Sequence, residues 1–299
     1  MLQGDTNTII YTVDDESKGM ELYDILRQFL HLSSRLIRKC KKDKGITVNR
    51  RVRSMNGVCN RGEEIKVYMK PDPNIFEPEN IPIEIVYEDM DIMVIDKPSG
   101  IVVHPTKNFK DGTIGNAIAY HAKEYGEDYK IRFVNRLDRD TTGLLIIAKN
   151  GFAQQFIQDQ MEARKVEKIY KALVEGIVEN DNGTINEPIG LPHEDAIQRA
   201  VIPNGKPSVT HYEVIERYSK GTLVKIRLET GRTHQIRVHM KHLGHVLVGD
   251  DLYGSTMTDL ISRQALQAVG LAFETPRNGW IKLHKDLPTD MLETIEKLK

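Results

Sequence analysis

The hydrophobic pattern of the first seventy residues predicts two helices followed by a small hairpin. Residues 19–32 carry apolar side chains at helical spacing. These are Leu22, Ile25, Leu26, Phe29 and Leu30. Residues 33–45 predict a second helix, with Leu36, Ile37 and Cys40 on its inner face and Gly45 as its stop. Two β-favouring stretches, 45–53 and 62–70, complete a compact unit.

The proline-rich stretch KPDPNIFEPENIP, residues 70–82, marks a boundary in the chain. Its four prolines favour a semi-rigid, extended linker over a helix or a central strand. We therefore predict a small domain over residues 1–72, a linker over 73–82 and a larger domain over 83–299.

From residue 83 onward, β-favouring runs adjoin one another too often for a strict βαβ repeat. Strand-like runs lie at 83–89, 91–100, 146–150, 167–178, 209–218 and 221–231. Helices are predicted at 113–126, 151–165, 233–244 and 288–299. This order predicts an α+β fold, with a mixed, largely antiparallel central sheet flanked by helices around a central cleft, and a small N-terminal α/β domain.

The composition is that of a soluble globular protein. The 299 residues are 28% charged, with a mean hydropathy of −0.43. Two cysteines are too few for a disulfide framework, and no apolar run approaches the ~20 residues of a membrane helix. The polar N-terminus shows no signal peptide, so a cytoplasmic protein is expected, with a monomer as the default.

The net charge of −1 hides a basic segment between Ser33 and Arg53. It holds nine lysines and arginines against one acidic residue, Asp43. A helix face built only for solvation would mix both signs, so we favour binding to a phosphate backbone. Because aromatic residues are missing from the segment, base stacking is not expected. The candidate phosphate-binding residues are Arg35, Arg38, Lys39, Lys42, Arg50 and Arg51.

The stretch VNRLDRDTTGLLIIAKN, residues 134–150, places charges directly before one of the most apolar runs of the chain. Charges at the edge of a core are costly unless they are paired or used. Asp138 lies between Arg136 and Arg139, and two adjacent guanidiniums would keep it charged as a nucleophile or base. The alternatives are a structural salt bridge, a reactive Asp140, or a D-x-D metal site, which the adjacent arginines disfavour.

Sequence signatures of P-loop nucleotide binding, serine hydrolases, zinc peptidases and thiol redox enzymes are absent.

In GRTHQIRVHMKHLGH, residues 231–245, Thr233 is expected to cap a helix. Arg237 falls in the first turn of that helix, where the dipole disfavours a cation, so it needs an anionic partner such as Asp138 or an RNA phosphate. The four histidines of this stretch do not repeat a metal-ligand spacing, and no metal is expected.

Two further features draw attention. Tyr170 lies in the strand-like run EKIYKALVEG, where a tyrosine is more often simply packed. Residues 187–208 have little periodicity, and long loops in compact domains are usually functional or disordered. Arg199 and Lys206 of this loop are candidates to clamp an RNA stem-loop, and removing its tip is then expected to raise KM more than it lowers the saturated rate.

Taken together, the motifs resemble the bacterial Rlu-type pseudouridine synthases. The matching segments, in the order of that family, are DKPSGIVVHP, NRLDRDTTGLLIIAKN, KIYKALVEG, GRTHQIRVHMKHLGHVLVGDDLYG and RQALQAVGLAF. The patterns R-L-D-x-x-T-[ST]-G and G-R-[ST]-H-Q-[IL]-R are highly specific in combination. The N-terminal unit resembles the small RNA-binding domain first recognised in ribosomal protein S-four.

The resemblance implies a role for each matching position. Asp138 would be the essential catalytic carboxylate, and Arg237 the arginine that pairs with it. Tyr170 would pack on the uracil and take part in deprotonating its carbon 5, and Arg136 would fill the gap left by a flipped base. The implied partner is structured RNA, in the first place large-subunit ribosomal RNA, with tRNA as the alternative.

The chemistry implied by the resemblance detaches uracil from ribose, turns it and rejoins it through carbon, so no cofactor is implied. Asp138 would attack the sugar, attack the base or abstract the 2′ proton, and all three routes are open. A non-catalytic RNA-binding protein and a retaining glycosidase are the rival readings, and the glycosidase needs a second carboxylate near Asp138. The chain departs from the family pattern at Asn135 and Gln267, where histidines are usual.

Overall fold

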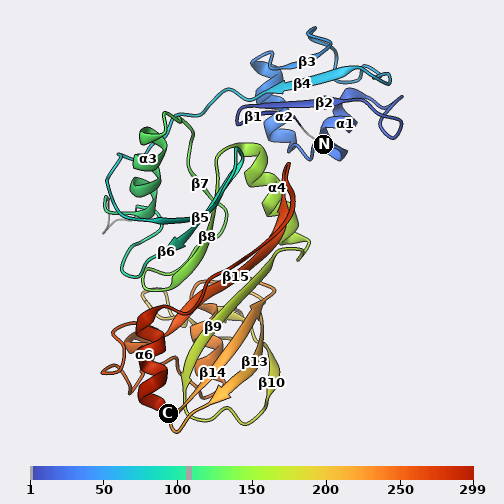
Figure 1. The fold of residues 1–299 in the computed structure, drawn as a ribbon. Helices are drawn as coiled ribbons and strands as arrows, with labels where there is room; N and C mark the ends of the chain where they lie inside the picture. The colour runs from blue at the N-terminus through green and yellow to red at the C-terminus, as the bar shows by residue number, and fades with distance from the viewer. Residues whose placement is uncertain (1–2, 106–109) are drawn as a thin grey trace.

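The computed structural model describes residues 3–105 and 110–299 (Figure 1). Its helices are α1 (Leu22–Gln28), α2 (Ser34–Lys42), α3 (Ile114–Glu124), α4 (Gly151–Glu162), α5 (Gln235–His242) and α6 (Thr289–Leu298). Its first strands are β1 (Gln3–Asp5), β2 (Thr8–Thr12), β3 (Ile46–Val48), β4 (Glu64–Tyr68), β5 (Glu84–Glu88), β6 (Ile92–Lys97), β7 (Arg132–Phe133) and β8 (Thr142–Ala148). The later strands are β9 (Glu167–Glu175), β10 (Asn182–Asn186), β11 (Ile189–Gly190), β12 (Ala200–Val201), β13 (Val209–Arg217), β14 (Gly221–Leu228), β15 (Leu266–Thr275) and β16 (Gly279–His284). In the described ranges, none of the helices combines the length and apolar character needed to cross a membrane.

A small unit lies at the N-terminal end of the molecule, with α1 and α2 beside a four-stranded antiparallel sheet (Figure 1). Both predicted helices are confirmed, although α1 already ends at Gln28. The Ser33 hydroxyl caps α2 by accepting the Leu36 amide at 3.2 Å. Strands β1 and β2 are not apparent from the sequence, because three and five residues are too short to show a clear alternation.

The core of this small unit is shared with the rest of the chain. It contains the buried side chains of α1, α2 and the four-stranded sheet, and also Phe152 from α4. The division at residues 72 and 83, and the likeness to the S-four domain, remain predictions.

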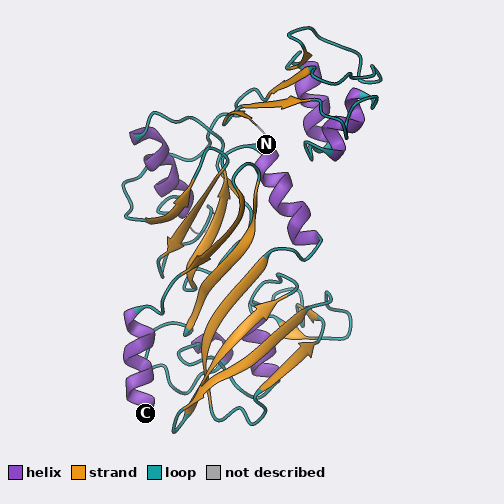
Figure 2. Cartoon of the chain, turned by 45° about the vertical axis from the view of Figure 1, so that its right-hand side comes forward, coloured by secondary structure: helices purple, strands orange, loops and turns teal. Residues whose placement is uncertain are grey.

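A long sheet carries the rest of the fold (Figure 2). Its order is β10-β13-β14-β9-β15-β8-β6-β5, with β16 beside β15 and β7 beside β8. Within the described residues only β8 and β15 pair in parallel, and the other neighbours are antiparallel. The predicted α+β class with a mixed, largely antiparallel sheet is confirmed.

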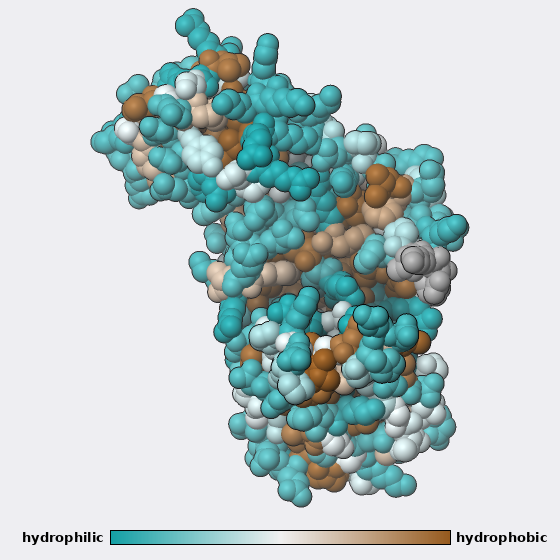
Figure 3. Space-filling model, turned by 180° about the vertical axis from the view of Figure 1, so that it is seen from behind, coloured by the Kyte–Doolittle hydropathy of each residue, from teal (hydrophilic) through white to brown (hydrophobic). Residues whose placement is uncertain are grey.

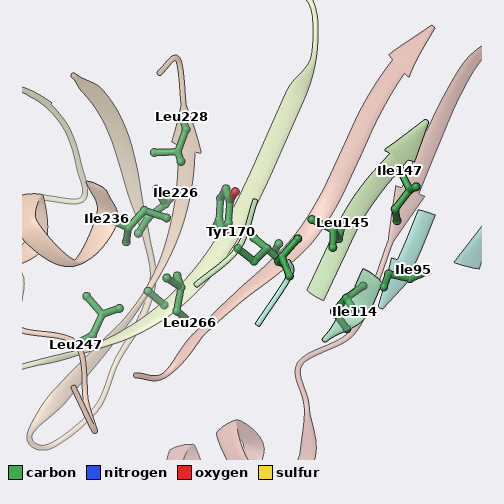
Figure 4. Close-up of a cluster of buried hydrophobic side chains, with 14 of the residues drawn as sticks. Ile95, Ile114, Leu145, Ile147, Tyr170, Ile226, Leu228, Ile236, Leu247 and Leu266 are labelled. Carbon is green, nitrogen blue, oxygen red and sulfur yellow. The ribbon is translucent and has the colours of Figure 1, made fainter. Parts of the chain in front are cut away.

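Strand β8 is buried along its whole length because both faces of the sheet are covered. Leu145 and Ile147 point to the face covered by α3, where they join a cluster that includes Tyr170 (Figure 4). Leu144 and Ile146 point to the opposite face and pack with side chains of α4. This alternation follows from the two-residue period of a strand and explains the continuous apolar run after the Asp138 loop.

Gly143 lies where β8 pairs in parallel with β15. Its φ of +109° and its position opposite Ala268 leave no room for a side chain. A Cβ atom there would lie 2.3 Å from the Ala268 carbonyl oxygen. The glycine therefore permits the parallel pairing that joins the two halves of the sheet next to the Asp138 loop.

The segment 187–208 is more structured than the sequence indicates. It contains the short antiparallel pair β11 and β12, with Ile189 opposite Val201. Two-residue strands leave too few positions for a periodic pattern to appear.

Candidate active site

Asp138 lies in the loop between β7 and β8, and the buried Lys97 at the end of β6 is hydrogen-bonded to the backbone of that loop. The Lys97 ammonium donates three hydrogen bonds of 2.7–2.8 Å, to the carbonyl oxygens of Pro98, Ile101 and Arg139. Burial lowers the pKa of Lys97 to about 8, and the charges of Asp140 and Asp138 oppose this shift. One side chain thus fixes the backbone of the loop.

The arginines that flank Asp138 in the sequence do not face its carboxylate. Arg139 forms an ion pair with Asp140 at 2.9 Å, and Arg136 donates to the Thr233 hydroxyl at 3.3 Å. The expectation that these two guanidiniums hold Asp138 is therefore wrong, because each has a nearer partner. The ion pair also occupies Asp140, the competing candidate for the reactive carboxylate.

The cation that faces Asp138 comes from α5. Arg237 is buried, and its Nη1 lies 3.5 Å from Asp138 Oδ2. Its Nε and Nη2 donate to the two carboxylate oxygens of Asp250 at 2.7 and 2.6 Å. Burial alone would lower the pKa of Arg237, but the hydrogen bonds and charge of Asp250 outweigh it and raise that pKa. The anionic partner predicted for Arg237 is mainly Asp250, with Asp138 second.

His234 closes the other side of Asp138. Its Nε2 lies 3.9 Å from Asp138 Oδ2, and its Nδ1 forms a 2.9 Å hydrogen bond with the Tyr253 hydroxyl. Burial lowers the pKa of His234, although the Asp138 charge opposes the shift, so the ring is neutral at neutral pH.

The expected Thr233 cap on α5 is wrong. The residue at the N-cap position is His234, with φ of 57° and no side-chain capping bond. The Gln235 side chain accepts the Arg232 amide at 3.0 Å instead. The helix thus begins at His234, a residue with left-handed backbone whose imidazole lies beside Asp138, and not at a threonine with a capping side chain.

Tyr170 forms an apolar wall beside Asp138. It lies on β9 and is 8% exposed. Ile226 and Leu228 of β14 lie to one side of it, and Leu145 of β8 lies to the other (Figure 4). Burial, and then the charge of Asp138, raise the pKa of Tyr170. The phenol therefore stays protonated at neutral pH, and the side chain is part of the apolar lining of the pocket.

Asp138 and several of the groups around it line one pocket of about 60 Å³. Its polar lining includes Asp138, Arg136, Arg237 and His234, and its apolar lining includes Tyr170. Among the lining residues Asp138 carries the one carboxylate. A retaining glycosidase needs two carboxyl groups about 5–5.5 Å apart across the scissile bond, so this pocket argues against that rival.

Comparison with known proteins places this pocket in a family. Residues 91–242 match the family model described as RNA pseudouridylate synthase, and this range includes Asp138, Tyr170 and Arg237. Ribosomal large subunit pseudouridine synthase D of Haemophilus ducreyi is 41% identical over 273 residues, which cover 86% of this chain and 82% of the relative. The chain belongs to the RNA pseudouridylate synthase family.

Further relatives agree with this assignment. An uncharacterized RNA pseudouridine synthase of Bacillus subtilis, YlyB, is 38% identical over 98% of this chain and 99% of its own length. The solved structure of human RNA pseudouridylate synthase domain containing 1 aligns with a TM-score of 0.59 and 27% identity, covering 73% of this chain and 86% of that one. The prediction of an Rlu-type RNA pseudouridine synthase is confirmed, and the protein is an enzyme that acts on RNA.

The two departures from the family pattern have structural roles in this synthase. The Asn135 side-chain oxygen accepts the Ile146 amide at 2.8 Å and so extends the pairing of β7 with β8. Gln267 is buried and accepts the Thr142 hydroxyl at 2.5 Å, while its amide donates to the Asp286 carbonyl. Neither residue lines the pocket.

The predicted RNA-contact residues of the synthase fall into separate places. Arg136 is exposed at the pocket, and the Arg199 amide donates to the Tyr253 hydroxyl at 2.9 Å, which attaches the 187–208 loop to the site. Lys206 is exposed at the far end of that loop. The basic residues of the N-terminal unit are exposed on α2 and on the turn after β3, and they do not line the pocket. They are Arg35, Arg38, Lys39, Lys42, Arg50 and Arg51.

Four residues of the site have no role assigned by the sequence analysis: Lys97, His234, Asp250 and Tyr253. Each lies in a segment that carries the family resemblance, in DKPSG, GRTHQIR or GDDLYG. Each of them has at least one partner more than ten residues away, so the sequence shows the motif but not the contact.

Proposed function

We propose that this synthase converts uridine to pseudouridine in structured large-subunit ribosomal RNA, with Asp138 as its catalytic carboxylate. The observation that carries the role of Asp138 is its position as the one carboxylate in the lining of the pocket. The RNA class rests on relatives that bear the name ribosomal large subunit pseudouridine synthase D, at 41 and 42% identity.

The proposed reaction is an isomerisation. The bond between N1 of uracil and C1′ of ribose breaks, the base turns, and C5 joins C1′. The proton on C5 is lost to solvent, and N1 receives a proton in return. No electron is gained or lost overall, so no redox cofactor is needed.

The contacts of Asp138 leave one oxygen for the substrate. Both polar neighbours, the cationic Arg237 and the neutral His234, approach Oδ2, and within the described residues Oδ1 has no hydrogen-bond partner. Attack on the sugar, attack on the base and removal of the 2′ proton would each use this oxygen. Arg237 would balance the carboxylate charge, and Asp250 would keep the guanidinium in place.

Tyr170 and Arg136 are proposed to handle the base. The target uridine must leave its stack to reach the pocket, at a cost of a few kcal/mol. Uracil would pack against the Tyr170 ring, and because burial raises the pKa of Tyr170, its phenol is protonated and would have to lose that proton before it could take the proton from C5. Arg136, exposed at the pocket mouth, is placed to occupy the gap left in the RNA stack.

The N-terminal unit and the 187–208 loop are proposed to bind the surrounding RNA. The unit would do so through the basic face of α2 and the turn after β3, as an S-four-like domain. The loop would do so through Arg199 and Lys206. A monomer in the cytoplasm is the simplest setting for such an enzyme.

Release of tritium from RNA labelled at C5 of uridine tests the proposal. Unmodified transcripts of large-subunit rRNA, small-subunit rRNA and tRNA would be compared, with a metal chelator present. We expect release from the large-subunit transcript alone. Release from tRNA alone would overturn the RNA class, and no release from any transcript would overturn the proposed activity.

A further inference from the structure

A second cavity, larger than the pocket at Asp138, lies away from that residue. It is a cleft of about 740 Å³ between the N-terminal unit and the central sheet. Its walls are α2, the segment after β4, the segment before β7, and the first half of α4. None of the groups around Asp138 lines it, so the catalytic pocket does not explain it.

The cleft is basic. Its charged lining residues are Arg35, Lys39, Lys70, Lys130, Arg132 and Lys149, against the single acidic residue Asp72. Asp72 binds Lys39 and Arg132, and Lys149 pairs with Glu88 and Glu127 outside the lining. Arg35, Lys70 and Lys130 form no ion pair within the described residues. Three uncompensated cations from three separate segments therefore converge on one cleft.

Neutral hydrogen-bonding groups complete the lining. Gln154 and Gln158 lie one turn apart on α4, and within the described part of the chain their side chains make no hydrogen bond. Cations suit phosphates, and amide side chains suit phosphate oxygens and ribose hydroxyls. The one aromatic residue in the lining, Tyr129, is 3% exposed and so offers no surface for base stacking. This combination fits the sugar-phosphate backbone of RNA.

The two walls of the cleft are held rigidly together. Phe152 of α4 is fully buried in the core of the N-terminal unit. Arg277, buried in a 2.7 Å ion pair with Asp91, donates to the Thr8 carbonyl at 3.1 Å, and Asn150 donates to the Thr6 carbonyl at 2.9 Å. Because these contacts are internal, the cleft keeps its shape without a ligand, which lowers the entropy cost of binding.

The cleft is connected to the active site by β7 and the loop that follows it. Arg132 at the cleft begins β7, which ends at Phe133, and Asp138 follows six residues after Arg132, so at most about 20 Å of chain separates the two residues. That upper limit corresponds to about six stacked nucleotides of one RNA strand. Arg35 and Lys39 bring the basic helix α2 into the lining of the cleft, and hydrophilic residues cover most of this end of the molecule on the face shown in Figure 3.

We propose that this cleft holds the backbone of a double-helical flank of the substrate RNA, at most about six nucleotides from the target uridine. Arg35, Lys70 and Lys130 bind phosphates, and Gln154 and Gln158 bind ribose 2′-hydroxyls. The N-terminal unit thereby measures the distance between a stem and the uridine that is modified. This inference rests on the proposed function, since it assumes that the RNA in the cleft is the substrate.

The test is the salt dependence of binding to an end-labelled RNA duplex of about 16 base pairs. The slope of log K against log salt should become shallower by about 3 in Arg35→Gln/Lys70→Gln/Lys130→Gln, one unit for each phosphate that the variant no longer binds. The matched control is Lys220→Gln/Lys282→Gln/Lys297→Gln, whose lysines are exposed, unpaired in the described structure and away from the cleft. An unchanged slope in the cleft variant, or an equal change in the control, would overturn the proposal.

Two further measurements test the role of the glutamines and the contribution of the cleft to substrate binding. Replacing Gln154 and Gln158 with alanine should reduce the preference for an RNA duplex over a DNA duplex of the same sequence, and an unchanged preference would overturn their assigned role. The cleft variant should also raise KM for the large-subunit transcript about tenfold or more with an unchanged kcat. Wild-type enzyme that releases no tritium would contradict the proposed function, while the duplex measurement would still decide the role of the cleft.

Discussion

At the scale of single residues, Arg237 connects the reactive carboxylate to the rest of the fold. Two of its nitrogens are held by Asp250, its guanidinium lies 4.8 Å from the centre of the Tyr253 ring, and the third nitrogen faces Asp138. A buried arginine with one carboxylate behind it cannot rotate away from the pocket without breaking two short hydrogen bonds. Asp250 is therefore a positioning residue, although it lies outside the lining of the pocket.

Asp250→Asn should lower the single-turnover rate about 100-fold, because Arg237 loses the geometry that directs it toward Asp138. It should also lower the free energy of unfolding by about 3 kcal/mol, since a buried charge is left with a poorer partner. Asp251→Asn, which changes an exposed carboxylate next in the chain, is the control and should leave both quantities unchanged. A rate loss that does not exceed that of the control would contradict the positioning role.

Lys97 gives a pH-dependent prediction. Below pH 8 it is charged in the folded and unfolded chains, so its burial destabilises the fold there. Between its folded pKa of about 8 and its ordinary value of 10.5, the unfolded chain holds a proton that the folded chain has lost, so this contribution rises with pH. Relative to Lys97→Met, wild-type unfolding free energy should increase by about 2 kcal/mol between about pH 7 and pH 9.5. Urea denaturation of both proteins measures this difference, and a constant difference would contradict it.

At the scale of elements, the site depends on the junction of β8 with β15. The parallel pairing spans only Thr142 with Gln267 and Gly143 with Ala268. It lies at the start of β8, directly after the Asp138 loop, and through β15 it joins β8 to β9, the strand that carries Tyr170. Gly143 is the residue that makes this close approach possible.

Gly143→Ala should lower the free energy of unfolding by at least about 3 kcal/mol, because a methyl group would collide with the Ala268 carbonyl in addition to straining the backbone. Gly62→Ala is the matched control, with φ of +82° and no atom within 4 Å of the added Cβ. It should cost only the backbone strain, about 1 kcal/mol. Equal losses in the two variants would show that the crossing does not need a glycine.

Long elements could be predicted from the sequence, whereas short ones could not. Helices such as α2 and α4 span enough residues to show an apolar face, and β8 shows an uninterrupted apolar run. The two- and three-residue strands β1, β11 and β12 show no period, and β2, with five residues, is scarcely longer. The expected start of α5 at Thr233 failed because the turn before it is set by Gln235, whose side chain bonds the Arg232 amide and Thr210.

At the scale of the whole molecule, the site combines β9, α5 and the loop before β8, which lie far apart in the sequence. Motifs were sufficient to identify Asp138, Tyr170 and Arg237 as members of one site. They could not show that Arg139 pairs with Asp140, or that Asp250, His234 and Tyr253 surround Arg237 and Asp138, because these contacts depend on how the chain returns to one place. The same holds for the basic cleft, whose lining residues come from five segments.

The most direct test of the account is tritium release by Asp138→Asn, measured beside its affinity for the large-subunit transcript. The substitution removes the charge but keeps the shape, so we expect no release and nearly unchanged binding. Asp140→Asn is the matched control, since that carboxylate pairs with Arg139 on the outer side of the same loop, and it should retain most of the activity. Substantial release by Asp138→Asn, or complete inactivation by Asp140→Asn, would contradict the assignment of Asp138 as the catalytic carboxylate.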